Sequence, residues 1–178
     1  MMKLYVKNRQ DSFVLKELLQ FIKSTSPGKR FSFSYVETST SLLPNLSLWE
    51  NLQLVSGVSE WIDLSSNLNP EYHTLINLIT SPELTASKAE DWDKMITSLV
   101  KGLISNPEFL LIDINEDCFS PLNLQNLKKI IHLMSTHRKV LLASANTTFW
   151  EDTSQSIITR DGFEFRIIDN LQTKKKVA

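Results

Sequence analysis

The sequence predicts an α/β fold with a mainly parallel sheet flanked by helices. Residues 109–112 form a continuous apolar run that ends in Asp113, and residues 140–143 form a second run of the same kind. Such runs are typical of parallel strands that are buried on both faces. Between them Pro121 opens a helical pattern, and a helix is the usual connection between two parallel strands.

The N-terminal part of the chain predicts a strand, a helix and a second strand. Residues 4–6 form a short apolar run, and apolar residues at helical spacing extend from Val14 to Ile22. Residues 26–28 read Ser-Pro-Gly, which indicates a turn. Residues 31–35 then alternate between aromatic and polar side chains, as expected for a strand.

The middle of the chain, from residue 47 to about residue 104, carries mainly helical signals. Its clearest pattern runs from Trp92 to Leu103, where apolar residues recur at steps of three and four. Asn106 and Pro107 follow, and this pair is expected to end the helix. We therefore predict a helical insertion over approximately 47–104.

The C-terminal part predicts one more helix and a closing hairpin. In the helix that Pro121 opens, Leu124, Leu127, Ile130, Ile131 and Met134 are expected to point inward. Residues 157–158 and 163–167 read as two short strands, with Asp161 and Gly162 at the tip of the turn between them.

Length and composition indicate a single domain, residues 1–178. The chain of 178 residues is 42% hydrophobic and 22% charged, which is ordinary for a globular domain. Its formal net charge of -1 gives no reason to expect nucleic acid as a partner. The one cysteine, Cys118, fits a reducing compartment, and no apolar stretch approaches the roughly 18 residues of a membrane helix. The expected location is the cytoplasm.

Three stretches, in the right order, resemble ABC-transporter ATPase domains. Residues 35–52, YVETSTSLLPNLSLWENL, resemble the family's Q-loop and the start of its helical subdomain. Residues 103–121, LISNPEFLLIDINEDCFSP, are similar to the Walker B strand and D-loop, and residues 139–162 resemble the H-loop strand and the terminal hairpin. The resemblance implies a P-loop NTPase-like core with a helical insertion and a C-terminal β-hairpin. The family's first antiparallel strands are expected to be missing.

The P-loop of that family has no counterpart in the sequence. The motif G-x-x-x-x-G-K-[ST] uses glycines to close backbone amides around phosphates and a lysine to neutralise their charge. The corresponding residues 6–13 read VKNRQDSF, without a glycine, and Asp11 stands at the lysine position. Gly28-Lys29 is no substitute, because a strand follows it where the motif requires a helix.

The remaining nucleotide-handling positions are replaced as well. Asp113 matches the Walker B aspartate, but Ile114 follows it where the family has the glutamate that polarises the attacking water. The signature glycines fall near Asp91 and Trp92 within residues 89–93, AEDWD. The Q-loop glutamine, the D-loop aspartate and the H-loop histidine fall in turn on Thr38 (or Glu37 with a different gap), Ser120 and Ala145.

The sequence therefore predicts a pseudo-ATPase without catalytic residues, cofactor or metal. Asp113 is either a relict magnesium ligand or, more commonly for a strand-end aspartate, a cap for backbone amides. His132 and His137 lie five residues apart and point to different faces of a helix, which argues against a zinc site. Ser144 and Asn146 lack the G-x-S-x-G motif of a hydrolase.

One segment is expected to bind a partner. In the resembling family, the region that corresponds to residues 42–46 borders the groove that accepts a helix of the membrane permease. The residues assigned to possible docking are Leu42, Leu43, Pro44, Asn45, Leu46 and Trp49. The alternative is that they simply pack in the core.

We expect a non-hydrolysing subunit or regulator that contacts an ABC permease, an ATPase subunit or another copy of itself, and that reaches the inner face of the membrane only through a partner. Two other hypotheses stay open. One is a nucleotide-binding switch or ATPase with a relocated phosphate site. The other is a free-standing binding module that uses an inherited fold.

Overall fold

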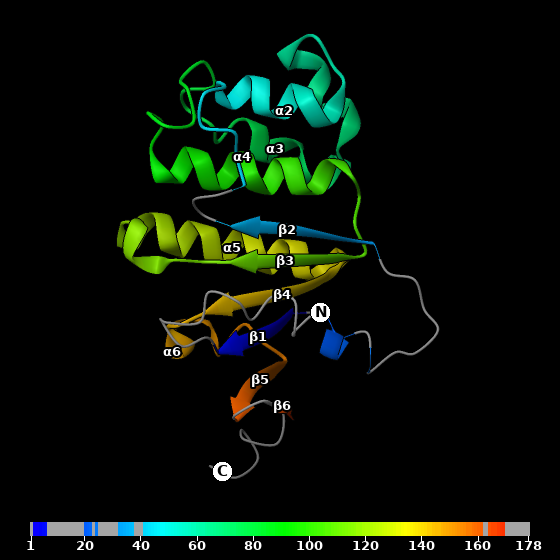
Figure 1. The fold of residues 1–178 in the computed structure, drawn as a ribbon, viewed down its shortest axis with the longest axis vertical. Helices are drawn as coiled ribbons and strands as arrows, with labels where there is room; N and C mark the ends of the chain where they lie inside the picture. The colour runs from blue at the N-terminus through cyan, green and yellow to red at the C-terminus, as the bar shows by residue number, and fades with distance from the viewer. Residues whose placement is uncertain are drawn as a thin grey trace.

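The computed structural model describes residues 2–6, 20–22, 24, 32–37, 41–161 and 164–169. In this part of the chain a six-stranded sheet forms one half of the molecule and a group of helices lies beyond one edge of the sheet (Figure 1). The strands are β1 (Met2–Val6), β2 (Phe33–Glu37), β3 (Phe109–Asp113), β4 (Lys139–Ser144), β5 (Ser156–Asp161) and β6 (Glu164–Asp169).

The sheet has the order β2-β3-β4-β1-β5-β6. All neighbouring strands pair in parallel except β5 and β6, which form an antiparallel hairpin. The carboxyl ends of β2, β3, β4 and β1 therefore meet at one edge of the sheet. In open sheets of parallel strands this is the edge at which ligands bind.

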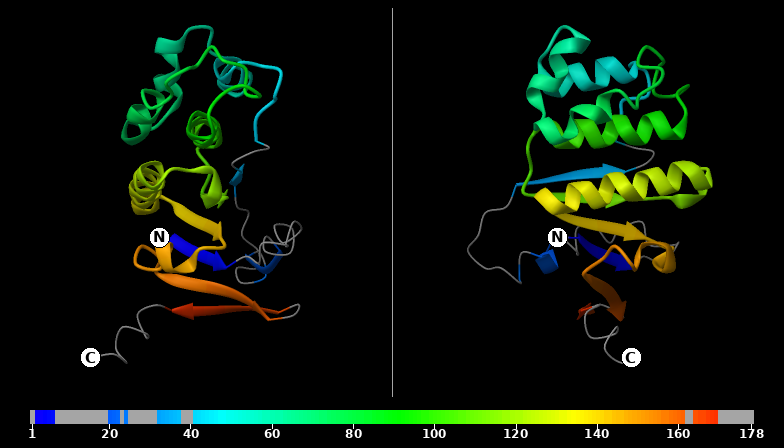
Figure 2. Two further views of the ribbon diagram at one scale, coloured as in Figure 1. Left: turned by 90° about the vertical axis from the view of Figure 1, so that its left-hand side faces the viewer. Right: turned by 180° about the vertical axis from the view of Figure 1, so that it is seen from behind.

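The helical elements between β2 and β3 are α2 (Leu48–Ser56), η1 (Trp61–Asn67), η2 (Pro70–Tyr72), α3 (His73–Ile76) and α4 (Asp91–Ile104). They lie together beyond β2 (Figure 1). After β3 come η3 (Glu116–Cys118), α5 (Pro121–His137) and α6 (Thr147–Trp150). The edge-on view in Figure 2 shows α5 lying along one face of the sheet.

Two hydrophobic clusters hold the sheet. On the α5 side, Leu127 and Ile131 of the helix join Ile112 and Leu142 of the strands in one large core that continues into the helical region. On the other side, Leu111 and its neighbours pack in a smaller cluster. Full burial of each such side chain contributes roughly 1.5–3 kcal/mol, so the strands are held mainly by the apolar runs that the sequence displays.

Helix α4 crosses close to β2 at Gly102. A Cβ atom at this position would lie 2.8 Å from Val36 Cγ2 and 3.2 Å from Ser34 Oγ, so a larger residue does not fit without a shift. This close approach brings the last turns of α4 against the outer strand of the sheet. It joins the helical region to the sheet.

The predicted fold class is confirmed, with one local correction. The hairpin was expected to turn at Asp161 and Gly162, but Asp161 belongs to β5 and pairs with Glu164. Asp-Gly is a common turn sequence, but the pairing of Asp161 with Glu164 makes this aspartate the last residue of β5. Of the predicted helix from Val14 to Ile22, residues 20–22 are described, and they are helical.

Candidate functional site

The carboxyl edge of the sheet brings two acidic residues together. Glu37 ends β2 and lies in register with Asp113, which ends β3. Tyr35, two residues before Glu37, donates a hydrogen bond of 3.4 Å from its hydroxyl to Asp113 Oδ2. Burial raises the pKa of the Tyr35 phenol, and the charges of Asp113 and Glu37 raise it further. The phenol therefore stays protonated and remains a donor to the carboxylate.

Ile114 occupies the position where the resembling family has its catalytic glutamate. Its side chain is fully buried in the main core, and its backbone amide donates to Ala143 O at 3.0 Å. A buried isoleucine can neither orient water nor accept a proton. The position is used for packing.

Glu116, in η3, connects the residues that follow β3 with those that follow β4. Its carboxylate accepts a hydrogen bond from the Ser144 hydroxyl. The same oxygen accepts one of 3.0 Å from the indole nitrogen of Trp150, whose side chain is fully buried. Ser144 Oγ in turn accepts the Asn146 amide at 2.9 Å. The three side chains fix the two loops against each other.

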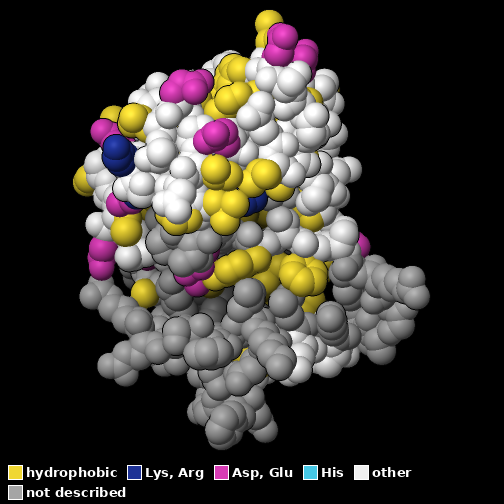
Figure 3. All heavy atoms as spheres, turned by 45° about the horizontal axis from the view of Figure 1, so that its top comes forward, with side chains coloured by type: hydrophobic (Ala, Val, Ile, Leu, Met, Phe, Trp, Pro, Cys, Tyr) yellow, Lys and Arg dark blue, Asp and Glu magenta, His cyan; other side chains and the backbone are white. Residues whose placement is uncertain are grey.

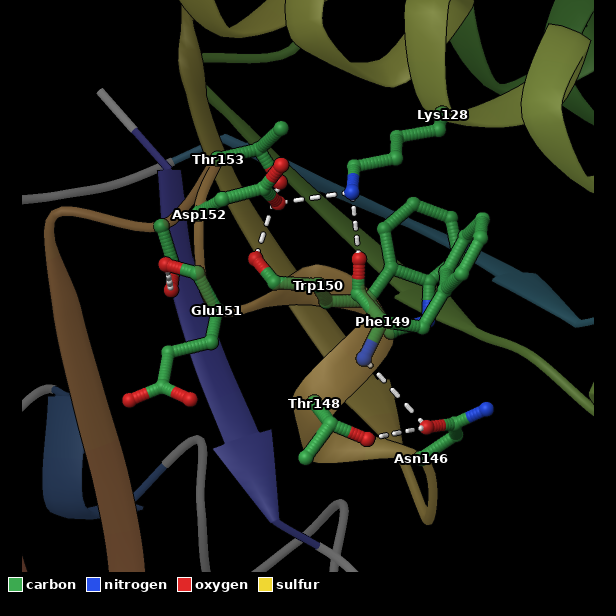
Figure 4. A network of polar contacts seen from close by, with 9 residues as sticks. Lys128, Asn146, Thr148, Phe149, Trp150, Glu151, Asp152 and Thr153 are labelled. Carbon is green, nitrogen blue, oxygen red and sulfur yellow. Dashed lines mark hydrogen bonds and ion pairs between the residues drawn. The ribbon is translucent and has the colours of Figure 1, made fainter.

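The short helix α6 is held in place by Lys128 of α5 (Figure 4). The Lys128 ammonium donates to Phe149 O, lies 4.6 Å from the centre of the Phe149 ring and pairs with Asp152 at 2.6 Å. Asn146 Oδ1 accepts from Phe149 N at 3.3 Å at the start of the helix. Ala145, which stands at the position of the H-loop histidine, therefore lies in a segment fixed by internal contacts.

The amino end of α4 is acidic. Glu90 is its N-cap residue, and Asp91 and Asp93 lie in its first turn. Carboxylates are stabilised there by the helix dipole and by unpaired backbone amides. In the resembling family this helix end offers glycine amides to a phosphate. Here three negative charges stand near the same amides and would repel an anion.

Asp93 also has a structural role. Its side chain is 2% exposed. It accepts hydrogen bonds from Thr80 N at 3.1 Å, Thr80 Oγ1 at 2.8 Å and Ser81 N at 3.1 Å. The carboxylate therefore anchors the segment between α3 and α4.

The segment predicted to dock a partner is a well-supported loop. Asn51 of α2 is fully buried. Its Oδ1 accepts from Leu43 N at 2.7 Å, and its Nδ2 donates to Leu43 O at 3.0 Å and Ser47 O at 2.9 Å. One side chain thus adds three hydrogen bonds to the backbone of the loop, whose turn is closed by the Leu46 N–H donating to Leu43 O at 3.2 Å.

A second segment, residues 86–87, also forms backbone hydrogen bonds to this loop. Ala86 N donates to Leu46 O at 2.9 Å and Ser87 N donates to Pro44 O at 3.1 Å. Ser47 begins α2 with a capping box, in which its hydroxyl accepts Glu50 N and the Glu50 carboxylate accepts Ser47 N. The loop therefore enters α2 in a fixed direction.

The six predicted docking residues divide into two groups. Leu43, Pro44 and Asn45 are exposed, and the Leu43 side chain is 51% exposed. Leu42, Leu46 and Trp49 are partly buried, and Trp49 packs edge-on against Trp61 with ring centres 5.2 Å apart. The exposed tip of the loop is the part that is available to another molecule. Figure 3, which views the helical end of the molecule, shows exposed apolar side chains there together with few basic side chains.

Several positions from the sequence comparison lie outside the described residues. These are residues 7–13 of the P-loop equivalent, Thr38, and Gly28-Lys29. Of the described ones, Ser120 is the N-cap of α5, where its hydroxyl accepts Asn123 N at 3.2 Å. Asp113 lies at the predicted strand end beside Glu37.

The overall fold is similar to that of known structures. In this chain β4 lies between β1 and β3, so the strand that precedes the P-loop equivalent is separated by one strand from the strand that ends in Asp113. Solved ABC-transporter structures match nearly the whole chain. The chain has the fold of an ABC-transporter ATPase subunit.

Two solved ABC-transporter structures illustrate the likeness. One is described as a metal-chelate type ABC transporter in an inward-facing conformation, with a TM-score of 0.66 and 11% identity over 97% of this chain and 72% of the other. The second is CbiO1 from Clostridium perfringens, part of the ABC transporter complex CbiONQ, with a TM-score of 0.70 and 8% identity over 99% and 80%. No family model and no curated protein matches the chain in sequence.

The fold is therefore similar although the sequence identity to these two structures is only 8–11%. An identity this low does not show which active-site residues are shared. Among the described helices, none is long and apolar enough to cross a membrane. The mainly parallel sheet flanked by helices matches the fold of these neighbours.

Sequence reasoning missed three residues that organise this site: Asn51, Asp93 and Glu116. Each is a polar side chain that forms hydrogen bonds to another segment of the chain. For Asn51 this segment is the preceding loop, and for Asp93 and Glu116 it is more distant in the sequence. The capping box at Ser47 and Glu50 was a readable signal for the start of α2. Nothing in the local pattern indicates that Asn51 turns back toward Leu43.

Proposed function

We propose that this protein is a non-hydrolysing ABC-ATPase-like subunit or regulator that acts by contact with another protein, an ABC permease in the first instance. An ATPase subunit and a second copy of this chain are the other partners of the proposal. The observation that carries it is the contrast between two parts of one structure. At the carboxyl edge of the sheet, here called the nucleotide edge, the side chains are buried or negatively charged, whereas the docking loop, residues 42–46, is fixed by many hydrogen bonds.

The nucleotide edge supports the absence of hydrolysis. Phosphoryl transfer needs positive charge and amide donors around the phosphates, and a carboxylate to place the water. Instead, Ile114 is buried, Ala145 carries no polar group, and the amino end of α4 bears carboxylates. The P-loop equivalent at residues 6–13 contains no glycine.

The docking loop supports a role in binding. Leu43 and its neighbours Pro44 and Asn45 are exposed, while the backbone beneath them is fixed by Asn51 and by residues 86–87. Because the loop is already ordered, a partner that binds it loses little conformational freedom in the protein. An exposed leucine on a rigid turn is a suitable anchor for an apolar helix face.

We expect no binding of magnesium-ATP when the purified chain is titrated up to about 1 mM nucleotide in a calorimeter, which corresponds to less than about 4 kcal/mol of binding free energy. The variant Asp113→Ala should give the same flat titration. Micromolar binding that Asp113→Ala abolishes would contradict the proposal. It would favour a nucleotide switch instead.

A photoreactive amino acid at position 43 should crosslink to a membrane permease in the cells that make this protein. Leu133 on α5 is the matched control, since it is an exposed leucine of similar accessibility, 42% against 51%. The expected product is one dominant adduct from position 43 and none from position 133. Equal labelling from both positions, or an adduct with soluble proteins alone, would argue for a free-standing module.

A further inference from the structure

A cavity of about 530 Å³ lies between β2, the end of α2 and the second half of α4. Its volume falls in the range of small-molecule pockets. The lining is largely polar, and the residues that give it this character are Ser34, Ser41, Ser56, Ser98, Lys101 and Ser105. It extends from Ser34, near the amino end of β2, and Ser105, which follows the last residue of α4, to Tyr35, whose hydroxyl bonds to Asp113 at the carboxyl edge of the sheet.

Two of these residues, Ser98 and Lys101, have hydrogen-bonding or charged groups that are not fully paired. Ser98 is 2% exposed, and its hydroxyl makes no hydrogen bond within the described part of the chain. A buried polar group without a partner is uncommon and unfavourable, because the loss of its hydrogen bonds to water is not compensated. Because Ser98, unlike the equally unpaired Thr97, lines the cavity, an oxygen of a bound ligand there would supply the partner.

Lys101 is the second such group. Its ammonium donates to Ser41 O at 2.8 Å, and burial lowers the pKa of this group. An ammonium has three donors and one positive charge. A neutral carbonyl uses one donor and leaves the charge without a counter-ion among the residues described.

The two groups stand on one helix three residues apart, so their side chains face the same side. A ligand that satisfies both must carry a negative charge for Lys101 and a hydrogen-bonding oxygen for Ser98. The surrounding serine hydroxyls can donate and accept, which suits several hydroxyl groups on the ligand. Neither an apolar molecule nor a cation would meet these requirements.

We propose that this cavity binds a small carboxylate that carries several hydroxyl groups, with its carboxylate on Lys101 and one of its oxygens on Ser98. The cavity adjoins the carboxyl edge of the sheet through Tyr35, but the proposed binding needs no phosphate chemistry. Ser41 directly precedes Leu42, the first docking residue, so a bound ligand would lie beside the surface that contacts the partner.

The test uses gluconate as the probe and the full chain labelled with nitrogen-15. Gluconate should cause saturable shifts in the amide signals of residues 98–105. Sorbitol, which has the hydroxyls without the carboxylate, and propionate, which has the carboxylate without the hydroxyls, should bind at least about tenfold more weakly, because each lacks one set of charged or neutral hydrogen bonds.

Three variants locate the binding. Lys101→Met and Ser98→Ala should each weaken gluconate binding, by about tenfold or more for the charged contact. Thr97→Val is the matched control, since Thr97 is also fully buried with an unpaired hydroxyl and lies outside the cavity lining. Thermal unfolding should show that Ser98→Ala and Thr97→Val are folded and no less stable than the parent.

The outcomes separate cleanly. Binding of gluconate that Thr97→Val retains and the other two variants lose supports the site. The proposal is overturned if gluconate causes no saturable shift up to about 10 mM, if sorbitol binds equally well, or if Lys101→Met binds as the parent does. None of these results depends on whether the chain binds ATP or a permease.

Discussion

Asn51→Ala is expected to lower the free energy of unfolding by about 2–3 kcal/mol, because it removes the acceptor of the Leu43 amide and two further hydrogen bonds to backbone carbonyls. The Asn51 side chain holds both the amide and the carbonyl of Leu43. Urea unfolding would give the loss in stability. Hydrogen exchange would locate it, since the Leu43 amide should lose its protection.

Asn77→Ala is the control for this experiment. Asn77 is exposed and lies in the same helical region, directly after α3. Its removal should change stability by less than about 0.5 kcal/mol. If Asn51→Ala were equally mild, or if Leu43 kept its protection, the loop would owe its shape to the backbone bonds from Ala86 and Ser87 alone.

Glu116→Ala is expected to cost about 2–3 kcal/mol of unfolding free energy. The variant would leave the Trp150 indole N–H buried without an acceptor, and the Ser144 hydroxyl would lose the same carboxylate. A buried donor left unpaired costs the larger part of its desolvation. Thermal or urea unfolding measures the loss, and the NMR signal of the Trp150 indole N–H should shift.

Glu116→Gln separates the hydrogen bonds from the side-chain volume. Glutamine keeps an oxygen that can accept from Trp150, so this variant should retain most of the stability that alanine loses. Glu83→Ala, at an exposed glutamate, serves as a surface control. A Glu116→Gln variant as unstable as Glu116→Ala would show that the negative charge, rather than the acceptor, is what matters.

The sequence predicted the elements whose apolar pattern is strong. The strand that ends at Asp113 and the helix that begins at Pro121 appear at the expected residues. In both cases local sequence and burial agree, because a buried parallel strand needs an unbroken apolar run and proline suits the first turn of a helix. The resemblance to ABC ATPases supplied the fold class, a P-loop NTPase-like core.

The contacts that shape the site were not predictable from local pattern. Glu116 and Trp150 are 34 residues apart and meet only because β3 and β4 are neighbours. Asp93 reads as one more acidic residue at a helix start, yet its carboxylate is turned inward to Thr80. The contact between Trp49 and Trp61 could not be predicted either, since only the course of η1 brings the two rings together.

The inward carboxylate of Asp93 also limits how this chain could change. Building a glycine-rich signature sequence into residues 89–93 would take away the acceptor for the Thr80 and Ser81 amides and the Thr80 hydroxyl. The segment before α4 would then lose its anchor before any nucleotide contact was gained. Any series of substitutions that introduced such a sequence would therefore pass through less stable intermediates. The present residues are in that sense entrenched, since Thr80 and Ser81 depend on the Asp93 carboxylate.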